Sequence, residues 1–226
     1  MTLLYKGKTK DVYENPDGTY TLKFKDTATG KDGVFDPGEN TVGLSIEGLG
    51  SESLRLSEHF FTLLKKVGIP SHYISSDISA TTMTVLPAPP IGNLEFICRR
   101  KADGSFLRRY GAYTQFGADL DYFVEVTIKD DQRGDPPINE DALITLGIMT
   151  REDYETCIRL TKQITKIISD ELSVKGLDLY DIKYEFGKTG DSIILIDEFS
   201  AGVMRVYKDN KPVPPMELAD LILGVD

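Results

Sequence analysis

The chain has 226 residues, of which 40% are hydrophobic and 27% are charged, and its formal net charge is −10. This is the composition of a globular protein with room for one large or two small domains, and the acidic balance disfavours a nucleic-acid-binding protein. No apolar run approaches the roughly 18 residues of a membrane span, and the N-terminal stretch lacks the apolar segment of a secretory signal. Two cysteines and two histidines are too few for a disulfide framework or a histidine-based metal site. These features predict a cytoplasmic protein without nucleic-acid or membrane partners.

Residues 3–25 predict hairpin strands with a turn at 15–18. The first part carries the sequence YKGKTKDVY, in which Gly7 lies between two lysines at a tight turn between strands. Glycine lets the backbone approach a phosphate closely, and lysines add positive charge. The stretch is not a P-loop, because the glycine expected five residues before Gly7 is missing. An anion site is one interpretation of this turn, and a solvated basic face is the other.

The next segments are expected to form a loop, a helix and two strands. Residues 26–50 are rich in glycine, aspartate and threonine and predict a long ordered loop. Apolar residues at helical spacing predict a helix over 51–67, and 72–86 predicts two strands. Three prolines stiffen the stretch LPAPPIGN at 86–93, which is therefore the candidate hinge between two lobes. The predicted lobes are residues 1–88 and 89–226.

A cluster of cations follows a short apolar strand predicted at 94–98. The sequence RRKADGSFLRRYG places Gly104 and Ser105 between two groups of basic residues. Backbone amides, a hydroxyl group and guanidinium groups together suit a phosphate monoester. The alternative is again a solvated basic face. The basic residues of this cluster are Arg99, Arg100, Lys101, Arg108 and Arg109.

Two further elements follow along the chain. Alternating residues at 123–129 predict a strand with its apolar side chains facing inward. The sequence KDDQRGDPP then gathers a lysine and three acids at the strand end, which fits a polar turn and a functional loop equally well. A capping pattern at Thr150 and an apolar stripe predict a long core-facing helix that ends at Gly176, with no cofactor implied.

The stretch YDIKYEFGKTGDSIILIDEFS, residues 180–200, predicts a hairpin with a turn at 187–190. Side chains alternate between the two faces of a strand, so its first strand has one charged and one apolar face. The charged row is either a solvated outer face or the floor of a site. A short closing helix at 216–224 completes an α+β chain with a cleft between its lobes. The charged row consists of Asp181, Lys183 and Glu185, and the second strand ends at Asp197 and Glu198.

Six stretches, in this order and spacing, resemble those of the SAICAR synthetase family of purine biosynthesis. They are YKGKTKDVY, FKDTAT, GSFLRRYG, KDDQRGDPPINED, YDIKYEFG and IDEFS with the MR that follows it. The resemblance covers nearly the whole chain. It implies an ATP-grasp-like fold with a small β-rich N-terminal lobe and a larger C-terminal α/β lobe. It also implies a homo-oligomeric ligase that couples carboxyaminoimidazole ribotide to L-aspartate through an acyl phosphate, using ATP and Mg²⁺.

The resemblance also assigns roles residue by residue. The ATP-binding residues would be Lys6, Gly7, Lys8, Lys10 and Leu86, the last bordering the adenine. The substrate-binding residues would be Glu95, Arg99, Gly104, Ser105, Arg109 and Arg205, with Arg99, Ser105 and Arg205 around the ribotide phosphate. The catalytic residues would be Lys129, Asp135, Asp181 and Lys183. Glu185 and Asp197 would hold Mg²⁺, an ion that proteins usually share between one or two carboxylates and substrate phosphates.

Several stretches depart from the family pattern, among them Tyr207, where tryptophan is common, and the C-terminal segment, in which the family's arginine-rich stretch is not recognisable. Gly48-Leu49-Gly50 stands where the family has Gly-Lys-Gly, Ser53-Leu54 where it has Asn-Asn, and Ser200-Ala201-Gly202 where it has Ser-Pro-Asp. The expected ATP and metal residues are unaffected, but positions on the substrate side differ. Two alternatives therefore stay open. One is a divergent ATP-dependent carboxylate-amine ligase or phosphotransferase of the same fold, and the other is a nucleotide-binding module without catalysis.

Overall fold

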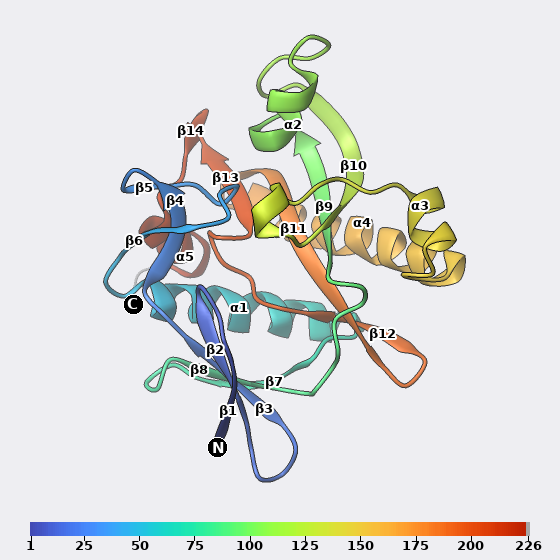
Figure 1. Cartoon of the computed structure of the whole chain (residues 1–226). Helices are drawn as coiled ribbons and strands as arrows, with labels where there is room; N and C mark the ends of the chain where they lie inside the picture. Colours follow the sequence, from blue (N-terminus) through green and yellow to red (C-terminus); the bar gives the residue numbers. More distant parts are fainter. Residues whose placement is uncertain (225–226) are drawn as a thin grey trace.

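The structure is a computed structural model that describes residues 1–224 (Figure 1). It is a mixed α/β fold, and every pairing between its named strands is antiparallel. The predicted combination of helices with antiparallel strands is therefore confirmed.

Three sheets organise the chain. The first has the order β1-β2-β3-β8-β7, with β1 (Thr2–Lys6), β2 (Lys10–Glu14), β3 (Tyr20–Phe24), β7 (Tyr73–Asp77) and β8 (Thr82–Val85). The second has the order β10-β9-β11-β13-β14, and β12 pairs with β11 off this path. Its strands are β9 (Leu94–Lys101), β10 (Asp119–Ile128), β11 (Asp178–Thr189), β12 (Ser192–Ile196), β13 (Met204–Lys208) and β14 (Lys211–Pro212). The small third sheet has the order β5-β4-β6, with β4 (Thr27–Lys31), β5 (Val34–Phe35) and β6 (Val42–Ser45).

Five helices and one 3₁₀ turn connect these strands in the described residues. They are α1 (Leu49–Lys66), α2 (Gly104–Tyr110), the 3₁₀ turn η1 (Asp131–Arg133), α3 (Glu140–Thr145), α4 (Arg151–Val174) and α5 (Pro215–Leu223). The predicted helix at 51–67 corresponds to α1, and the predicted long helix corresponds to α4. Thr150 caps α4 as expected, because its Oγ1 accepts a hydrogen bond from the backbone N–H of Asp153 at 3.1 Å.

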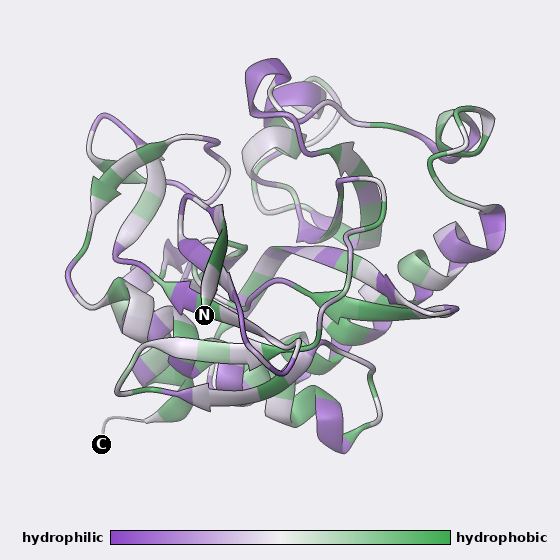
Figure 2. Ribbon diagram, turned by 60° about the horizontal axis from the view of Figure 1, so that its bottom comes forward, coloured by the Kyte–Doolittle hydropathy of each residue, from purple (hydrophilic) through white to green (hydrophobic). Residues whose placement is uncertain are grey.

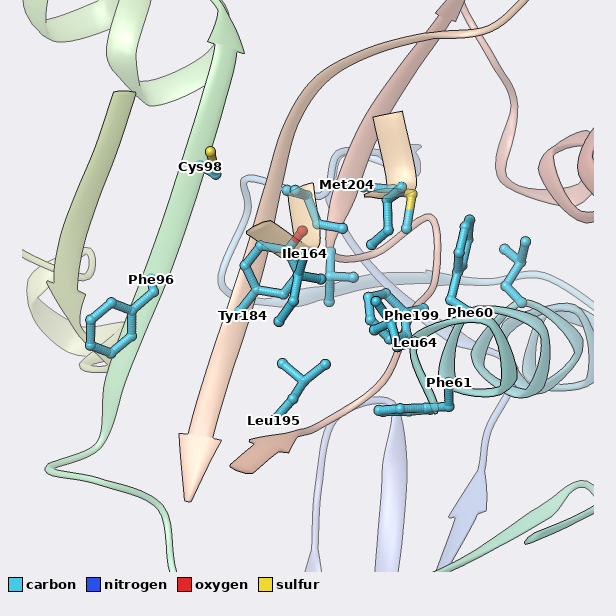
Figure 3. Packing of buried hydrophobic residues seen from close by; sticks show 14 of the residues in the cluster. Phe60, Phe61, Leu64, Phe96, Cys98, Ile164, Tyr184, Leu195, Phe199 and Met204 are labelled. Atoms are coloured by element: carbon cyan, nitrogen blue, oxygen red, sulfur yellow. The ribbon is translucent and has the colours of Figure 1, made fainter. Parts of the chain in front are cut away.

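One continuous hydrophobic core joins the sheets and helices. It contains residues of β3 and α1 from the N-terminal part as well as residues of α4, β9 and β11 from the C-terminal part. Figure 3 shows Phe60 and Phe61 of α1 beside Phe199, whose ring lies 4.9 Å from that of Phe61, centroid to centroid. The core therefore contains residues from both sides of residue 88, and the lobe boundary there stays a prediction.

Helix α1 also fixes the chain segment that follows β12. Ser57 is buried, and its hydroxyl group donates a hydrogen bond to the carbonyl oxygen of Phe199 at 2.9 Å. The hydroxyl oxygen of Ser57 in turn accepts a hydrogen bond from the backbone N–H of Phe199 at 3.0 Å. Buried polar groups are nearly always hydrogen-bonded, so these two bonds fix the backbone of Phe199 against α1. The backbone next to Asp197 and Glu198 is positioned in this way.

The prediction of a long loop at 26–50 was wrong. This stretch contains the three strands β4, β5 and β6 of the small sheet, and α1 already begins at Leu49. Its glycines reflect close contacts between strands: a Cβ at Gly30 would lie 2.1 Å from the carbonyl oxygen of Val34, and one at Gly43 would lie 2.4 Å from that of Gly30. The glycines therefore allow strands to approach, although in the sequence they suggested a loop.

The predicted hairpin turn at 187–190 was also misplaced. Strand β11 continues to Thr189, and the turn lies at residues 190–191. Gly187 is a strand residue. Glycine is favoured there because a Cβ would lie only 3.0 Å from the Cβ of Ala88, in the proline-rich segment that crosses this strand. The second predicted strand, at 192–196, agrees with β12.

Helices in the described part of the chain are amphipathic rather than membrane-spanning. None of them is both long enough and apolar enough to cross a bilayer. Figure 2 shows hydrophilic residues interrupting the long helices, as the sequence patterns predicted.

Both cysteines are expected to resist thiol reagents in the folded protein. Cys98 and Cys157 are fully buried, and burial raises the pKa of the Cys98 thiol to about 11 and that of Cys157 to about 12. Because the thiolate is the reactive form, native protein at pH 8 should react far more slowly than protein in denaturant. A chromogenic disulfide reagent measures both rates. Rapid labelling of the native protein would contradict this assignment of the cysteines to the core.

Candidate active site

A cavity of about 690 Å³ collects most of the residues that the sequence singled out. Residues of β2, β3 and β4 line it on one side, and residues of β9, β10, β11 and β13 line it on the other. Fourteen of the predicted site residues line this cavity: Gly7, Lys8, Lys10, Glu95, Arg99, Ser105, Arg109, Lys129, Asp135, Asp181, Lys183, Glu185, Asp197 and Arg205.

The charged row of β11 forms part of the cavity floor, and its three side chains line the cavity. The intervening residues Ile182 and Tyr184 are buried in the core on the opposite face. The interpretation as a fully solvated face was therefore wrong, since Asp181 is only 3% exposed and Glu185 only 8%. The alternation of a regular strand places the whole row in the site.

Two carboxylates at one end of the cavity face lysines. Lys129 Nζ lies 2.5 Å from Glu185 Oε1, and Lys10 Nζ lies 2.5 Å from Asp197 Oδ1. Lys10 also contacts Glu198. Burial and the neighbouring charge of Asp197 raise the pKa of Glu185. Burial also acts to raise the pKa of Asp197, but the positive charges of Lys10 and Lys129 outweigh it and hold this pKa well below its usual range.

The backbone at Asp197 is strained, with φ of +72° at a residue that has a side chain. A hydrogen bond of 2.9 Å joins its carbonyl oxygen to Nε2 of the buried His72. Strained residues of this kind persist where the surrounding structure over-determines them, and they cluster at functional sites. Asp197 lines the cavity, as Glu185 does.

A second pair of side chains lies next to this end. Lys183 Nζ lies 2.9 Å from Glu95 Oε1, and the hydroxyl group of Thr127 donates to Glu95 at 3.2 Å. Asp135 accepts a hydrogen bond of 2.7 Å from the backbone N–H of Asp130, while burial raises the pKa of its carboxyl group. Acids and bases therefore alternate across the cavity floor.

Arg99 has a different environment from the one the sequence predicted. It lies inside β9 rather than after it and is 1% exposed. Its guanidinium group donates to Asp181 Oδ2 at 2.9 Å and to Ser105 Oγ at 2.9 Å, and it also contacts Glu125. These partners use four of the five N–H donors of Arg99, so the guanidinium group positions Asp181 and Ser105 and keeps one donor on Nη1.

Arg205 anchors the opposite end of the cavity. Its Nη1 lies 2.9 Å from Asp181 Oδ2, and its Nη2 lies 3.2 Å from Oδ1 of Asp36, the residue that follows β5. A Cβ at Gly38 would lie 2.3 Å from Arg205 Nη2, and one at Gly104 would lie 2.7 Å from the same atom. Glycine at both positions therefore lets the guanidinium group fit between the small sheet and α2.

Three predicted site residues lie outside the lining of this cavity. Tyr5 and Gly7 line it, so strand alternation turns Lys6 away. Leu86 is 43% exposed because it follows the buried Val85 and faces the other side. Gly104 lines a neighbouring cavity of about 530 Å³, and its N–H donates to the side chain of Asp103 at 2.6 Å, so this amide is not the free anion donor that the sequence suggested.

Several lining residues had no role in the sequence-based prediction. The small sheet and the loop before β6 contribute residues that were interpreted as part of a long loop. Asp131 lies 2.6 Å from Lys8, although only its place in the sequence KDDQRGDPP marked it. These additional residues include Asp36, Gly38, Glu39, Asn40, Ser53, Asp131 and Glu198.

Comparisons with known proteins agree on one family. The family model described as SAICAR synthetase matches residues 3–216. The phosphoribosylaminoimidazole-succinocarboxamide synthase of Clostridium tetani (strain Massachusetts / E88) is 55% identical over 226 residues, covering 99% of this chain and 100% of the relative. The corresponding synthase of Finegoldia magna is 34% identical and covers 99% of this chain and 96% of the relative.

Solved structures show the same likeness. A SAICAR synthetase (Type-2) in complex with ADP superposes with a TM-score of 0.87 at 27% identity, covering 98% of each chain. The SAICAR synthetase (Type-1) of Pyrococcus horikoshii OT3 has a TM-score of 0.84 at 27% identity and covers 96% of this chain and 98% of that one. With a matching family model, a full-length relative and the site residues gathered in one cavity, the chain belongs to the SAICAR synthetase family.

Proposed function

We propose that this protein is an ATP-dependent ligase that joins carboxyaminoimidazole ribotide and L-aspartate to form SAICAR, ADP and phosphate in purine biosynthesis. The observation that carries the proposal is the full-length likeness to the C. tetani synthase, combined with a cavity lined by the matching acids and bases. The catalysed step forms a carbon–nitrogen bond. The cytoplasmic location and the homo-oligomer that the family resemblance implies are parts of the same proposal.

The nucleotide is proposed to bind at the end of the cavity formed by Gly7, Lys8 and Lys10. The backbone turns sharply at Gly7, whose N–H donates to the carbonyl oxygen of Lys10 at 3.0 Å, and a Cβ there would lie 2.5 Å from that oxygen. Such a turn brings lysine charge close to the cavity floor. The ADP complex of a family member supports nucleotide binding in this fold.

The reaction is proposed to run in two steps. A carboxylate oxygen of the ribotide attacks the γ-phosphorus of ATP, the bond to the β-phosphate oxygen breaks, and ADP leaves. The amine of aspartate then attacks the resulting acyl phosphate, phosphate leaves, and the amine loses a proton. Lys10, Lys129 and Lys183 supply fixed positive charge for the transferring phosphoryl group. Asp135, whose pKa is raised by burial, is suited to accept the proton from the amine.

Glu185 and Asp197 are proposed to hold Mg²⁺. They are adjacent in the cavity and interact strongly enough for the charge of Asp197 to raise the pKa of Glu185. The described residues contain no group of three or more side chains from His, Cys, Asp and Glu that would form an all-protein metal cage. A pair of carboxylates fits Mg²⁺, which usually completes its shell with water and substrate phosphates. When bound, the ion would neutralise charge on the transferring phosphoryl group.

We also propose an ATP-grasp-like arrangement, in which two parts of the chain enclose the cavity. Residues from 1–88 supply the turn at Gly7 and the small sheet, while residues from 89–226 supply the charged floor. These two parts correspond to the predicted lobes. Since they share one core, any movement between them is expected to be limited to the small sheet and the turn.

Release of ADP is expected to require both the ribotide and aspartate. The acyl phosphate forms only from the ribotide carboxylate, and its displacement requires the amine. The measurement is ADP release in a coupled assay with each substrate omitted in turn, followed by mass analysis of the product. A protein that released ADP with a different amine, and not with aspartate, would be a divergent ligase instead.

A further inference from the structure

His72 is a buried residue to which the proposed reaction assigns no role. It lies between α1 and β7, is 5% exposed and lines neither of the two cavities. Its Nε2 lies 2.9 Å from the carbonyl oxygen of Asp197, and the imidazole is the donor in this hydrogen bond because a carbonyl oxygen only accepts. A buried side chain therefore contacts the backbone of a proposed metal-binding residue and not the cavity.

A short parallel pairing with β12 brings His72 to this position. Ser71 pairs with Leu195: the N–H of His72 donates to the carbonyl oxygen of Leu195 at 2.9 Å, and the N–H of Leu195 donates to that of Pro70 at 3.0 Å. The next step of a parallel ladder would offer the carbonyl oxygen of Asp197 an N–H from the second residue of β7. Strand β7 pairs with β8 instead, so the imidazole of His72 supplies the donor that the ladder does not.

The hydrogen bond matters because the backbone of Asp197 is left-handed, with φ of +72°. A residue with a side chain stays in this conformation only where its surroundings hold it there. The backbone sets the direction of Cβ, so a change of φ would carry the carboxylate of Asp197 away from its place beside Lys10. Ser57 already fixes the backbone two residues later, at Phe199. His72 provides the corresponding restraint at Asp197 itself.

We infer that His72 is a positioning residue for the proposed metal site, where its ring N–H holds Asp197 in the left-handed conformation and keeps the carboxylate in place for Mg²⁺. This inference rests on the proposed function and deepens it. The imidazole ring also packs on Phe61, with 5.5 Å between the ring centroids. An apolar side chain would reproduce that packing but not the hydrogen bond, which makes the two roles separable.

The test compares His72→Leu, which removes the donor, with His72→Gln, whose side-chain amide can replace it. ADP is titrated calorimetrically into each protein, once with Mg²⁺ and once with EDTA. In His72→Leu the affinity for ADP with Mg²⁺ should fall about ten- to a hundredfold, the usual effect of removing a group that orients a metal ligand. The affinity for ADP with EDTA should stay close to that of the wild type, and His72→Gln should retain the response to Mg²⁺.

Two further variants separate positioning from lost stability. Ile222→Ala in α5 is the control for lost core packing, since Ile222 is 1% exposed and lines neither cavity. It should lower the melting temperature and leave the response to Mg²⁺ unchanged. In an Asp197→Asn background, His72→Leu should add little to the loss, because His72 acts through Asp197. Fully additive losses would overturn the inference.

The wild type offers a measurement that does not depend on whether the variants fold. The chain has two histidines, so isotope-labelled histidine gives few NMR signals, and the Nε2–H of His72 should exchange slowly with water. An Nε2 without a proton, or an unchanged response to Mg²⁺ in a folded His72→Leu, makes His72 a core residue only. Either result overturns the inference while the proposed function stands. A wild-type protein that neither binds ADP nor forms product removes both.

Discussion

Glu185→Gln and Asp197→Asn are each expected to lower turnover by roughly a hundredfold or more, because metal assistance to phosphoryl transfer is worth several kcal/mol. Each substitution keeps the shape of the side chain and removes the negative charge that would hold Mg²⁺. Both carboxylates line the cavity, and each pairs with a lysine, Glu185 with Lys129 and Asp197 with Lys10. Loss of either charge should therefore weaken the binding of Mg²⁺. It should also change the position of the lysine that pairs with the lost carboxylate, Lys129 or Lys10.

The two variants should differ in stability, because the pKa shifts have opposite signs. The pKa of Glu185 is raised by burial and by Asp197, so the folded state disfavours its charge and Glu185→Gln should not lower the melting temperature. The pKa of Asp197 is lowered by Lys10 and Lys129 despite burial, so folding favours its charge and Asp197→Asn should lower the melting temperature. That contribution is present above the ordinary pKa of 3.8 and is lost as the pH falls below it.

The measurements are turnover against Mg²⁺ concentration and a melting curve for each variant without ligands. Asp191→Asn is the matched control, since Asp191 lies at the tip of the same hairpin, is exposed and does not line the cavity. It should leave turnover unchanged. Unchanged turnover of both Glu185→Gln and Asp197→Asn at low Mg²⁺ would remove the proposed metal site.

The sequence predicted the floor of the cavity well because the relevant geometry is local. Alternation along one strand decides which side chains share a face, so Asp181, Lys183 and Glu185 could be assigned to one row before any tertiary contact was known. The same reasoning applies to Tyr184 on the apolar face, which is buried as expected. Helices α1 and α4 were equally predictable, since their apolar stripes and caps are local signals.

The small sheet and the environment of Arg99 could not be predicted in this way. Gly30 and Gly43 indicate a loop in a sequence, and only the approach of β4 to its neighbours shows why they are strand residues. The partners of Arg99 are 26 and 82 residues away along the chain, at Glu125 and Asp181. The register of β9 with β10 and β11 brings them together, and that register depends on the whole sheet.

Arg99→Met is expected to lower the free energy of unfolding by about 3–5 kcal/mol, because removing one member of a buried ion-pair network leaves uncompensated charge behind. Methionine has a similar length and fills the space with apolar atoms. Asp181 is 3% exposed and Glu125 is 8% exposed, so water reaches neither carboxylate easily. Each carboxylate keeps one other cationic partner in the variant, Arg205 for Asp181 and Arg109 for Glu125. The loss of stability should therefore stay within this range.

Urea unfolding curves of the wild type, Arg99→Met, Arg99→Lys and Arg109→Met provide the test. Arg99→Lys keeps the charge but loses the planar fork of donors, so its loss of stability should be intermediate. Arg109→Met also removes a partner of Glu125, but the side chain of Arg109 is partly exposed. Exposed ion pairs contribute only about 0–1 kcal/mol to the free energy of unfolding, so this variant should lose less stability. If Arg99→Met and Arg109→Met were equally stable while Arg99→Met alone raised the KM for the ribotide, Arg99 would contact the substrate directly, as the sequence first indicated. Because four of the five N–H donors of Arg99 already bind Glu125, Asp181 and Ser105, a large loss of stability with an unchanged KM for the ribotide assigns Arg99 to the scaffold that positions Asp181 and Ser105.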